Sequence, residues 1–169
     1  MLKNAFDYSF TYINKKFMYI NESNIMKAYD LMSVDIEAAK ENATVVEIGT
    51  RIILRSINGM PIIDDDGKVI GILTIIDILR AIKENKDLDA LRAKDIMTTN
   101  PIVIKQETDI VDIIDIMDKN GIEMVPVIDE GTDNRIIGVV SRKDIIEEKF
   151  NEKFITIGMK RTITRTLGQ

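Results

Sequence analysis

The second half of the chain shows two alternating patterns of apolar residues. Apolar side chains at helical spacing from Asp109 to Lys119 predict an amphipathic helix, and Asn120-Gly121 is typical of the left-handed turn that ends one. Short β-branched runs on either side predict strands. The predicted elements are a strand, a helix, the two strands of a hairpin and a closing helix, at residues 101–104, 109–119, 125–128, 135–140 and 142–150.

The first half repeats this pattern. Its hairpin consists of strands at 61–63 and 69–73, joined by the turn Asp64-Asp65-Asp66-Gly67, and its closing helix runs from Ile75 to about Lys83. The middle strands are apolar on both faces, which predicts a sheet that is covered on both sides.

The two halves align when the chain is shifted by about 65 residues. Residues 60–64 fall on 125–129, and 70–77 fall on 137–144 after two residues are added within 130–134. A surface hairpin tolerates an insertion best in such a Gly/Asp/Asn turn. The chain is therefore predicted to be α+β, with two tandem β-α-β-β-α units that pack on each other because one unit is too small for a good core.

The repeat divides the chain into an aromatic-rich N-terminal extension, two repeats and a basic C-terminal tail, at 1–22, 23–86, 87–150 and 151–169. Aromatic residues alternate with polar ones from Phe6 to Tyr12, which is typical of a half-buried strand, and residues 154–157 are β-prone. We expect these ends to pair with each other or with a second chain in a homodimer; frayed ends are the alternative. Residues 23–32 predict a short helix capped by Ser23 or Asn24.

Composition narrows the chemistry. The 169 residues include no cysteine and no histidine, which excludes disulfides, Cys/His zinc sites, thiol nucleophiles and triads built on imidazole. The net charge of −5 disfavours nucleic acid as the main partner, because neutralising phosphates requires a basic face. No apolar run reaches membrane-spanning length and no signal peptide is visible, so we expect a cytoplasmic protein without membrane contact.

One motif closes both hairpins: a glycine, two apolar residues, Thr or Ser, and an aspartate three positions later. It stands at Gly71-Ile72-Leu73-Thr74-Ile75-Ile76-Asp77 and at Gly138-Val139-Val140-Ser141-Arg142-Lys143-Asp144. The preceding strands at 59–64 and 124–129 share a Pro-apolar-apolar-Asp pattern, and 95–101 leads into the second repeat. This ordered set resembles the cystathionine-β-synthase (CBS) domain pair, or Bateman module, over roughly residues 25–150.

The resemblance implies a pseudo-two-fold sandwich with two clefts between the repeats. Its usual ligands are adenosine compounds, namely AMP, ADP, ATP, S-adenosylmethionine or methylthioadenosine, which act as regulatory ligands and not as cofactors. Such modules sense energy state or metabolites and control an attached enzyme, a transporter or a partner protein. The ligand-binding residues implied by the matching motifs are Met60, Pro61, Thr74, Asp77, Thr98, Asn100, Ile102, Met124, Val125, Pro126, Ser141, Arg142, Lys143 and Asp144.

The pairs Thr74/Asp77 and Ser141/Asp144 each have two interpretations. As capping boxes, the hydroxyl accepts from the third helical amide and the carboxylate reaches back to the N-cap amide. As ligand sites, the helix N-terminus attracts a phosphate, and the carboxylate accepts the hydroxyls of a ribose. Both interpretations require the same geometry.

The two repeats differ beside these motifs. Arg142 and Lys143 stand at a helix N-terminus, where the dipole disfavours cations, so they are either solvated surface charges or neutralise a phosphate. At the matching positions the first repeat has Ile75 and Ile76, which cannot neutralise charge. We therefore expect the second repeat to hold the nucleotide, and the first to be empty or to hold a ligand of little charge.

Nucleotide-binding members of the family often carry a basic residue just before the proline of the second strand. Here residues 58–60 and 123–125 contain no cation and one added carboxylate, Glu123. This disfavours a triphosphate and favours AMP or an adenosyl thioether such as S-adenosylmethionine. The turn 64–67 lacks the spaced ligands of a calcium loop, and a charged hairpin turn explains it without a metal.

The sequence favours a regulatory sensor that binds an adenosine compound and signals to a partner through a conformational change. The alternative is a structural protein-interaction module with vestigial clefts. A nucleic-acid-binding regulator that uses the basic tail is a weaker hypothesis, because four cations make few phosphate contacts. No nucleophile–base pair is visible, so we expect neither an enzyme nor a catalytic metal.

Overall fold

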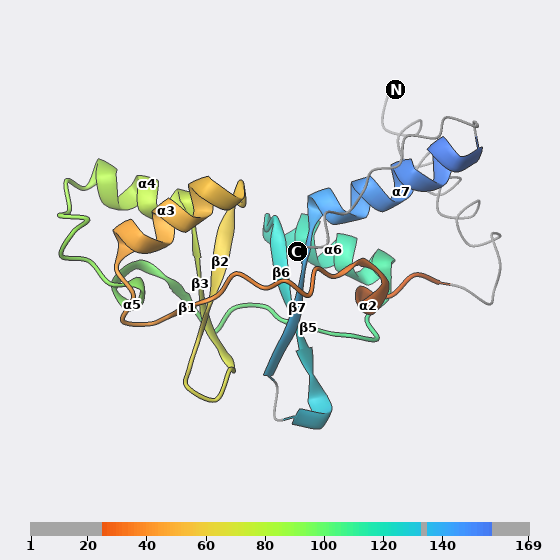
Figure 1. Ribbon diagram of the computed structural model, residues 1–169, viewed down its shortest axis with the longest axis horizontal. Helices are drawn as coiled ribbons and strands as arrows, with labels where there is room; N and C mark the ends of the chain where they lie inside the picture. The colour runs from red at the N-terminus through yellow and green to blue at the C-terminus, as the bar shows by residue number, and fades with distance from the viewer. Residues whose placement is uncertain (1–24, 133–134, 157–169) are drawn as a thin grey trace, which may run out of the picture.

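The computed structural model describes residues 25–132 and 135–156. They form two lobes whose sheets stand next to each other at the centre, with helices on the outside (Figure 1). Lobe 1 contains residues 39–99, and lobe 2 contains residues 26–33 and 104–156. The predicted α+β fold, a tandem pseudo-two-fold sandwich, is confirmed.

Lobe 1 is built on a four-stranded sheet of order β1-β2-β3-β4, in which β1 is parallel to β2 and the other neighbours are antiparallel. Its strands are β1 Ala39–Lys40, β2 Gly59–Ile63, β3 Val69–Thr74 and β4 Thr98–Thr99. Its helices are α3 Val45–Arg55, α4 Ile75–Lys83 and α5 Ala93–Ile96. The α3 side chains that face the sheet pack in the lobe 1 core with Met60, Ile62 and Leu73.

Lobe 2 is built on a three-stranded sheet of order β5-β6-β7. Its strands are β5 Ile104–Lys105, β6 Met124–Asp129 and β7 Arg135–Ser141. Its helices are α2 Ala28–Leu31, α6 Ile110–Asn120, the short 3-10 helix η1 Glu130–Thr132 and α7 Arg142–Thr156. Gly121 ends α6 with a φ of 63°, as its left-handed C-cap position predicts.

The first helix of each repeat packs on the opposite lobe. Helix α2 lies at the start of the first repeat, but Ala28 and Leu31 lie in the lobe 2 core; helix α5 lies near the start of the second repeat, but Ala93 lies in the lobe 1 core. The chain continues from α2 and α5 through two linkers, residues 33–38 and 98–103, that cross between the lobes (Figure 1). The two repeats in the sequence are therefore not the two packing units of the structure.

Both hairpins and the helices α4 and α6 form where they are predicted, and α3 is the first repeat's counterpart of α6. The strand predicted at 101–104 shrinks to β5, because Pro101 has no amide for a ladder and Asn100 turns the chain with a φ of 49°. The helix predicted at 23–32 covers only Ala28–Leu31 and starts at the N-cap Lys27; Ser23 and Asn24 lie outside the described residues.

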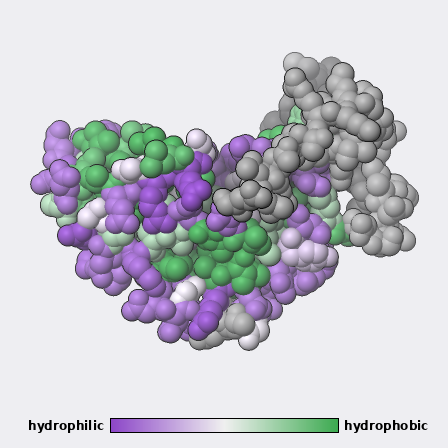
Figure 2. Space-filling model, viewed as in Figure 1, coloured by the Kyte–Doolittle hydropathy of each residue, from purple (hydrophilic) through white to green (hydrophobic). Residues whose placement is uncertain are grey.

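The β-prone segment 154–157 was a wrong prediction as far as Thr156, since α7 continues through it. Its strand propensity depends on a neighbouring strand, and none of the described strands lies beside it. The predicted N-terminal strand from Phe6 to Tyr12 and the tail beyond Thr156 lie outside the described residues. Exposed apolar side chains cover the outer surface of α3 and α4 (Figure 2).

Candidate functional site

Helix α4 begins with a closed capping box. The carboxylate of Asp77 accepts the Thr74 amide at 2.9 Å and the Thr74 hydroxyl, both at Oδ2. Its other oxygen, Oδ1, accepts from Arg80 Nη1 at 3.1 Å. Asp77 is only 7% exposed, so both of its oxygens are occupied by protein donors in a buried place.

Helix α7 begins with the same motif in a more open form. Asp144 Oδ2 accepts the Ser141 amide at 2.8 Å and the Ser141 hydroxyl at 2.7 Å, and the Asp144 amide donates to Ser141 Oγ at 3.2 Å. Asp144 is half-buried, and its Oδ1 has no partner within residues 25–132 and 135–156. The carboxylate of α7 therefore keeps one oxygen for a ligand, whereas that of α4 does not.

The first amide of each helix is also taken. Ile75 N donates to the carbonyl of Asn58 at 3.0 Å, and Arg142 N donates to the carbonyl of Glu123 at 3.0 Å. Since the capping box uses the third amide, two of the first three amides at each N-terminus are already satisfied. A phosphate at either position would meet fewer free donors than a helix N-terminus normally offers.

Asn58 and Glu123 also join the two lobes. They occupy matching positions before the second strand of each repeat, and Asn58 Nδ2 donates to Glu123 Oε2 at 2.5 Å. Through their carbonyls they bring the N-termini of α4 and α7 together, with the exposed carboxylate of Glu123 between them. The carboxylate of Glu123 therefore adds negative charge where the two helix N-termini meet.

The two cations expected to neutralise phosphate have partners within lobe 2, although both side chains are exposed. Arg142 Nε donates to the Ile122 carbonyl at 3.0 Å, and its Nη2 donates to the Met117 carbonyl at 3.3 Å, so the guanidinium caps the C-terminal end of α6. Lys143 Nζ lies 3.5 Å from Glu147 Oε1, one helical turn away. The unfavourable place of Arg142 in α7 thus has a structural reason, whereas Lys143 forms only an exposed ion pair.

Because the linkers cross between the lobes, the predicted site residues lie beside different partners than the sequence order suggests. Thr98 pairs with Ile72 of β3, two residues before Thr74, and Ser33 pairs with Val139 of β7, two residues before Ser141. By sequence order Thr98, Asn100 and Ile102 belong with Ser141 and Asp144. In the structure the linker that carries them starts beside the strand leading to Thr74, and linker 33–38 starts beside the strand leading to Ser141.

Several predicted ligand residues are core residues. Met60 and Val125 are fully buried in the lobe 1 and lobe 2 cores, and Pro61 and Pro126 are buried beside them. Their side chains are not available to a ligand in this arrangement. Met124, paired with Ser141, is half-buried, whereas Thr98, Asn100 and Ile102 are exposed.

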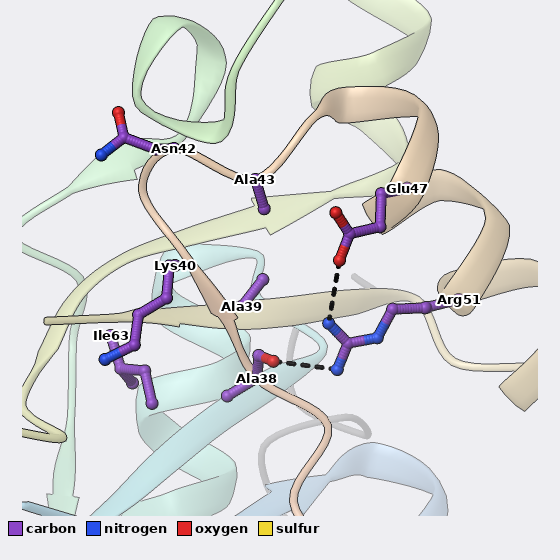
Figure 3. A pocket seen from close by; sticks show the side chains of 8 residues that line it. All are labelled: Ala38, Ala39, Lys40, Asn42, Ala43, Glu47, Arg51 and Ile63. Carbon is purple, nitrogen blue, oxygen red and sulfur yellow. Dashed lines mark hydrogen bonds and ion pairs between the residues drawn. The ribbon is translucent and has the colours of Figure 1, made fainter. Parts of the chain in front are cut away.

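A shallow pocket of about 350 Å³ lies elsewhere, on lobe 1 between β1 and α3 (Figure 3). Small or aliphatic side chains line part of it, and Lys40, Asn42, Glu47 and Arg51 supply its polar groups. Arg51 donates to Glu37 Oε2 from Nε at 3.1 Å and from Nη2 at 2.6 Å. The hydrogen bonds from this guanidinium hold the pKa of Glu37 below its ordinary value.

The sequence contained a signal for this pocket that was not used. The repeat alignment sets Ala38, Ala39 and Ala43 against the larger Val103, Ile104 and Thr108, so the smaller side chains of the first repeat leave more space there. None of the candidate ligand residues lines the pocket.

The described residues contain no group of three carboxylates placed to hold a metal ion. In the aspartate-rich turn, Asp64 Oδ1 accepts the amides of Asp66 and Lys68 at 3.0 and 2.9 Å, as a side chain that shapes a hairpin turn does. Within the same residues, no helix has the length and apolar character needed to cross a membrane.

Known proteins resemble this chain in sequence and in fold. The chain is 32% identical over 124 residues to the L-aspartate semialdehyde sulfurtransferase of Methanocaldococcus jannaschii, which covers 73% of this chain but only 23% of that protein. The inosine-5'-monophosphate dehydrogenase of the same organism matches at 27% over 125 residues, 74% of this chain and 24% of that enzyme. The chain thus spans about a quarter of the length of these two relatives.

The solved structures that resemble the chain are CBS domain pairs. One is the pair of protein MJ0100 in complex with 5'-methylthioadenosine and S-adenosyl-L-methionine, with a TM-score of 0.67 and 32% identity over 77% of this chain and 99% of that one. CBSX2 in complex with AMP shares the fold with a TM-score of 0.65 at 20% identity over 75% of this chain and 98% of that one. The CBS domain family matches residues 28–84 and 93–151, and with the repeat, the exchanged linkers and the paired capping motifs this establishes that the chain belongs to the CBS domain family.

Proposed function

We propose that this CBS pair is a regulatory module that binds an adenosyl compound without a polyphosphate, of the methylthioadenosine or S-adenosylmethionine type. The observation that carries the proposal is the state of the two helix N-termini. Each has two of its first three amides satisfied, and the Glu123 carboxylate lies between them.

The charged side chains near the α7 N-terminus also favour a ligand without a polyphosphate. Arg142 and Lys143, the cations nearest the α7 N-terminus, are directed to the end of α6 and to Glu147. A di- or triphosphate would therefore stand near Glu123 without a free cation from this motif, and the like charges would repel each other. A neutral thioether avoids that repulsion, and a sulfonium gains from the carboxylate.

The ribose end is supported by Asp144. Its Oδ1 can accept a ribose hydroxyl without breaking the capping box, because Oδ2 alone holds Ser141. At Asp77 a hydroxyl would have to displace Arg80 from Oδ1. The N-terminus of α7 is therefore the stronger adenosyl site, and the MJ0100 complex supports the ligand class by analogy.

The regulatory step follows from the position of these groups. The linker 33–38 starts beside β7 of lobe 2 and runs to lobe 1. A ligand that contacts both Asp144 and this linker fixes the path between the lobes, so it favours one relative arrangement of the lobes over others. We propose that this shift is read by a partner protein or an attached domain.

Isothermal titration calorimetry of the full chain with methylthioadenosine, S-adenosylmethionine, AMP and ATP tests the proposal. We expect the two thioether-type ligands to bind at least about tenfold more tightly than ATP, which corresponds to roughly 1.4 kcal/mol. The preference should shrink in a Glu123→Gln variant, in which the Asn58 contact can persist without the charge. Tighter binding of ATP, or no binding of any of the four at millimolar concentration, would contradict the proposal.

A further inference from the structure

The pocket between β1 and α3 lies away from the site proposed for an adenosyl compound. Ile63 lines it at the C-terminal end of β2, whereas Asn58 and the N-terminus of α4 stand at the other end of that strand. At about 3.3 Å per residue of extended chain, roughly 15 Å separates the two places. The pocket's volume of about 350 Å³ is at the small end of the usual range of about 300–1,000 Å³, so it suits a metabolite smaller than a nucleoside.

The guanidinium of Arg51 is held on one side of the pocket. Its Nε and Nη2 donate to Glu37, and Nη2 also donates to the Ala38 carbonyl at 2.9 Å. Arg55 Nε approaches the other oxygen of Glu37 to 2.8 Å. Within the part of the chain that the structure describes, Arg51 Nη1 makes no hydrogen bond, and Glu47 Oε1 lies 3.9 Å from it. Arg51 therefore offers the pocket a donor nitrogen in a fixed position.

The carboxylate of Glu47 also has room for a ligand. Glu47 is the third residue of α3, at the spacing from the N-cap Thr44 where a carboxylate normally accepts the N-cap amide. The Thr44 hydroxyl accepts the Glu47 amide at 3.0 Å, but among the described residues the carboxylate approaches only Arg51. Asp77 and Asp144, by contrast, close the capping boxes of α4 and α7. Figure 3 shows the Glu47 side chain directed toward Arg51 across the pocket.

The remaining polar groups of the pocket have other partners. Lys40 lies 3.3 Å from Asp65 of the hairpin turn, and Lys105 forms the matching ion pair with Glu130 in lobe 2. The Asn42 side-chain oxygen accepts from Lys94 Nζ at 2.8 Å. Arg51 and Glu47 are thus the charged groups of the pocket that have atoms left for a ligand.

Lobe 2 shows that the fold does not need these charges. The repeat alignment sets Ile102 and Ile116 at the positions of Glu37 and Arg51, and Ile116 packs against the lobe 2 core. The side chains of Glu37 and Arg51 are only 20% and 32% exposed. An ion pair withdrawn from water to this extent is seldom more stabilising than apolar residues of similar volume. The polar set of lobe 1 therefore indicates a role other than folding.

We propose that this pocket binds a free α-amino acid with a short aliphatic side chain. The ammonium donates to Glu47, and the carboxylate accepts from Arg51 Nη1. The gap of 3.9 Å between these two groups exceeds the length of a hydrogen bond, about 3.2 Å at most, and a zwitterion matches it because it carries both opposite charges on one carbon. An amine alone would leave Nη1 without an acceptor, and a carboxylate alone would meet the like charge of Glu47.

The apolar wall accounts for the side chain of the ligand. Ala39, Ala43 and Ile63 line the pocket with aliphatic groups, and lobe 2 has the larger Ile104 and Thr108 in place of the two alanines. Branched aliphatic chains of three or four carbons fit such a wall, whereas charged chains would lose hydration there.

Titration of the full chain with L-valine, followed by the NMR signals of isotope-labelled alanine methyl groups, tests the proposal. We expect the methyl groups of Ala38, Ala39 and Ala43 to shift with a dissociation constant on the order of 1 mM, because half-exposed charge pairs contribute little. The fully buried Ala28 and Ala93 should not shift. Isobutylamine, which lacks the carboxylate, and isovalerate, which lacks the ammonium, should each bind at least about tenfold more weakly.

A matched pair of variants completes the test. Glu47→Gln should weaken valine binding at least about tenfold, and Asp112→Asn, at the corresponding position of lobe 2, should leave it within about twofold. Thermal melts check that both variants fold. Equal binding of isobutylamine or isovalerate, equal effects of the two variants, or no shift at tens of millimolar valine would overturn the proposal. Calorimetry of Glu47→Gln with methylthioadenosine should match the parent chain, so failure of the amino acid site and failure of the adenosyl site are distinguishable.

Discussion

At the start of the first linker, Met32 packs against Gly138 of β7, and this contact predicts the stability of a Gly138→Ala variant. A Cβ atom there would lie 2.5 Å from Met32 Sδ, 2.8 Å from its Cγ and 2.9 Å from its Cβ. The thioether end of Met32 can move, but its Cβ is attached to a linker whose next residue, Ser33, exchanges two backbone hydrogen bonds with Val139 at 2.9 and 3.1 Å. Gly138→Ala should therefore push the linker away from the sheet.

The magnitude follows from two opposing effects. Overpacking of this kind costs about 1–3 kcal/mol, while replacing a strand glycine with alanine restores about 0.5–1 kcal/mol of backbone entropy. The two ranges leave a net loss of roughly 0–2.5 kcal/mol, and because the Met32 Cβ cannot move freely we expect about 1–2 kcal/mol. With an m-value of about 2 kcal/mol per molar urea, this lowers the midpoint of unfolding by roughly 0.5–1 M.

Urea unfolding followed by circular dichroism measures the effect, and Gly49→Ala is the matched control. Gly49 lies inside α3 and its added Cβ meets Ile78 at an ordinary 3.4 Å, so alanine should stabilise the protein by about 0.5–1 kcal/mol. Met32→Ala combined with Gly138→Ala should recover part of the loss, as a positive coupling in a double-mutant cycle. A Gly138→Ala variant as stable as the parent would refute the reasoning.

Three further predictions concern charged groups. The Arg51 guanidinium lowers the folded-state pKa of Glu37, so the ion pair stabilises the protein fully above the ordinary glutamate pKa of 4.5, and this stabilisation is lost as the pH falls toward the lower folded pKa. The Glu37→Gln variant should therefore show a flatter dependence of stability on pH below 4.5. An unchanged slope contradicts this prediction. Asp77→Ala should cost about 1 kcal/mol of stability with little effect on adenosyl binding, whereas Asp144→Ala should weaken binding about tenfold, and the reverse order would count against the site assignment. Arg142→Ala should lower stability by about 0.5–1.5 kcal/mol and leave thioether affinity within about threefold; a large loss of affinity would return Arg142 to the ligand site.

The structure also changes how the two repeats relate to function. Arg142 appeared from the sequence to make the second repeat a phosphate site, but it holds the end of α6. The asymmetry that remains lies in the carboxylates, because Asp144 keeps a free oxygen and Asp77 does not.

The sequence by itself determined the features that depend on a few neighbouring residues. The helical period of 110–120, the turn at Gly121 and the capping boxes at Thr74 and Ser141 are set by contacts within one or two turns, so the local pattern was enough. The repeat was readable for the same reason, since equal local patterns at a fixed spacing build equal units.

Only the tertiary structure decided which surfaces those units meet. That α2 packs in lobe 2, that Thr98 lies beside β3, that Met60 and Val125 are core residues and that Arg142 reaches the end of α6 all depend on groups distant in sequence. An amphipathic pattern indicates which face of a helix is buried, but it does not indicate which element covers that face, because the hydrophobic effect is non-directional. The partner of each face was therefore settled by how the linkers cross between the lobes.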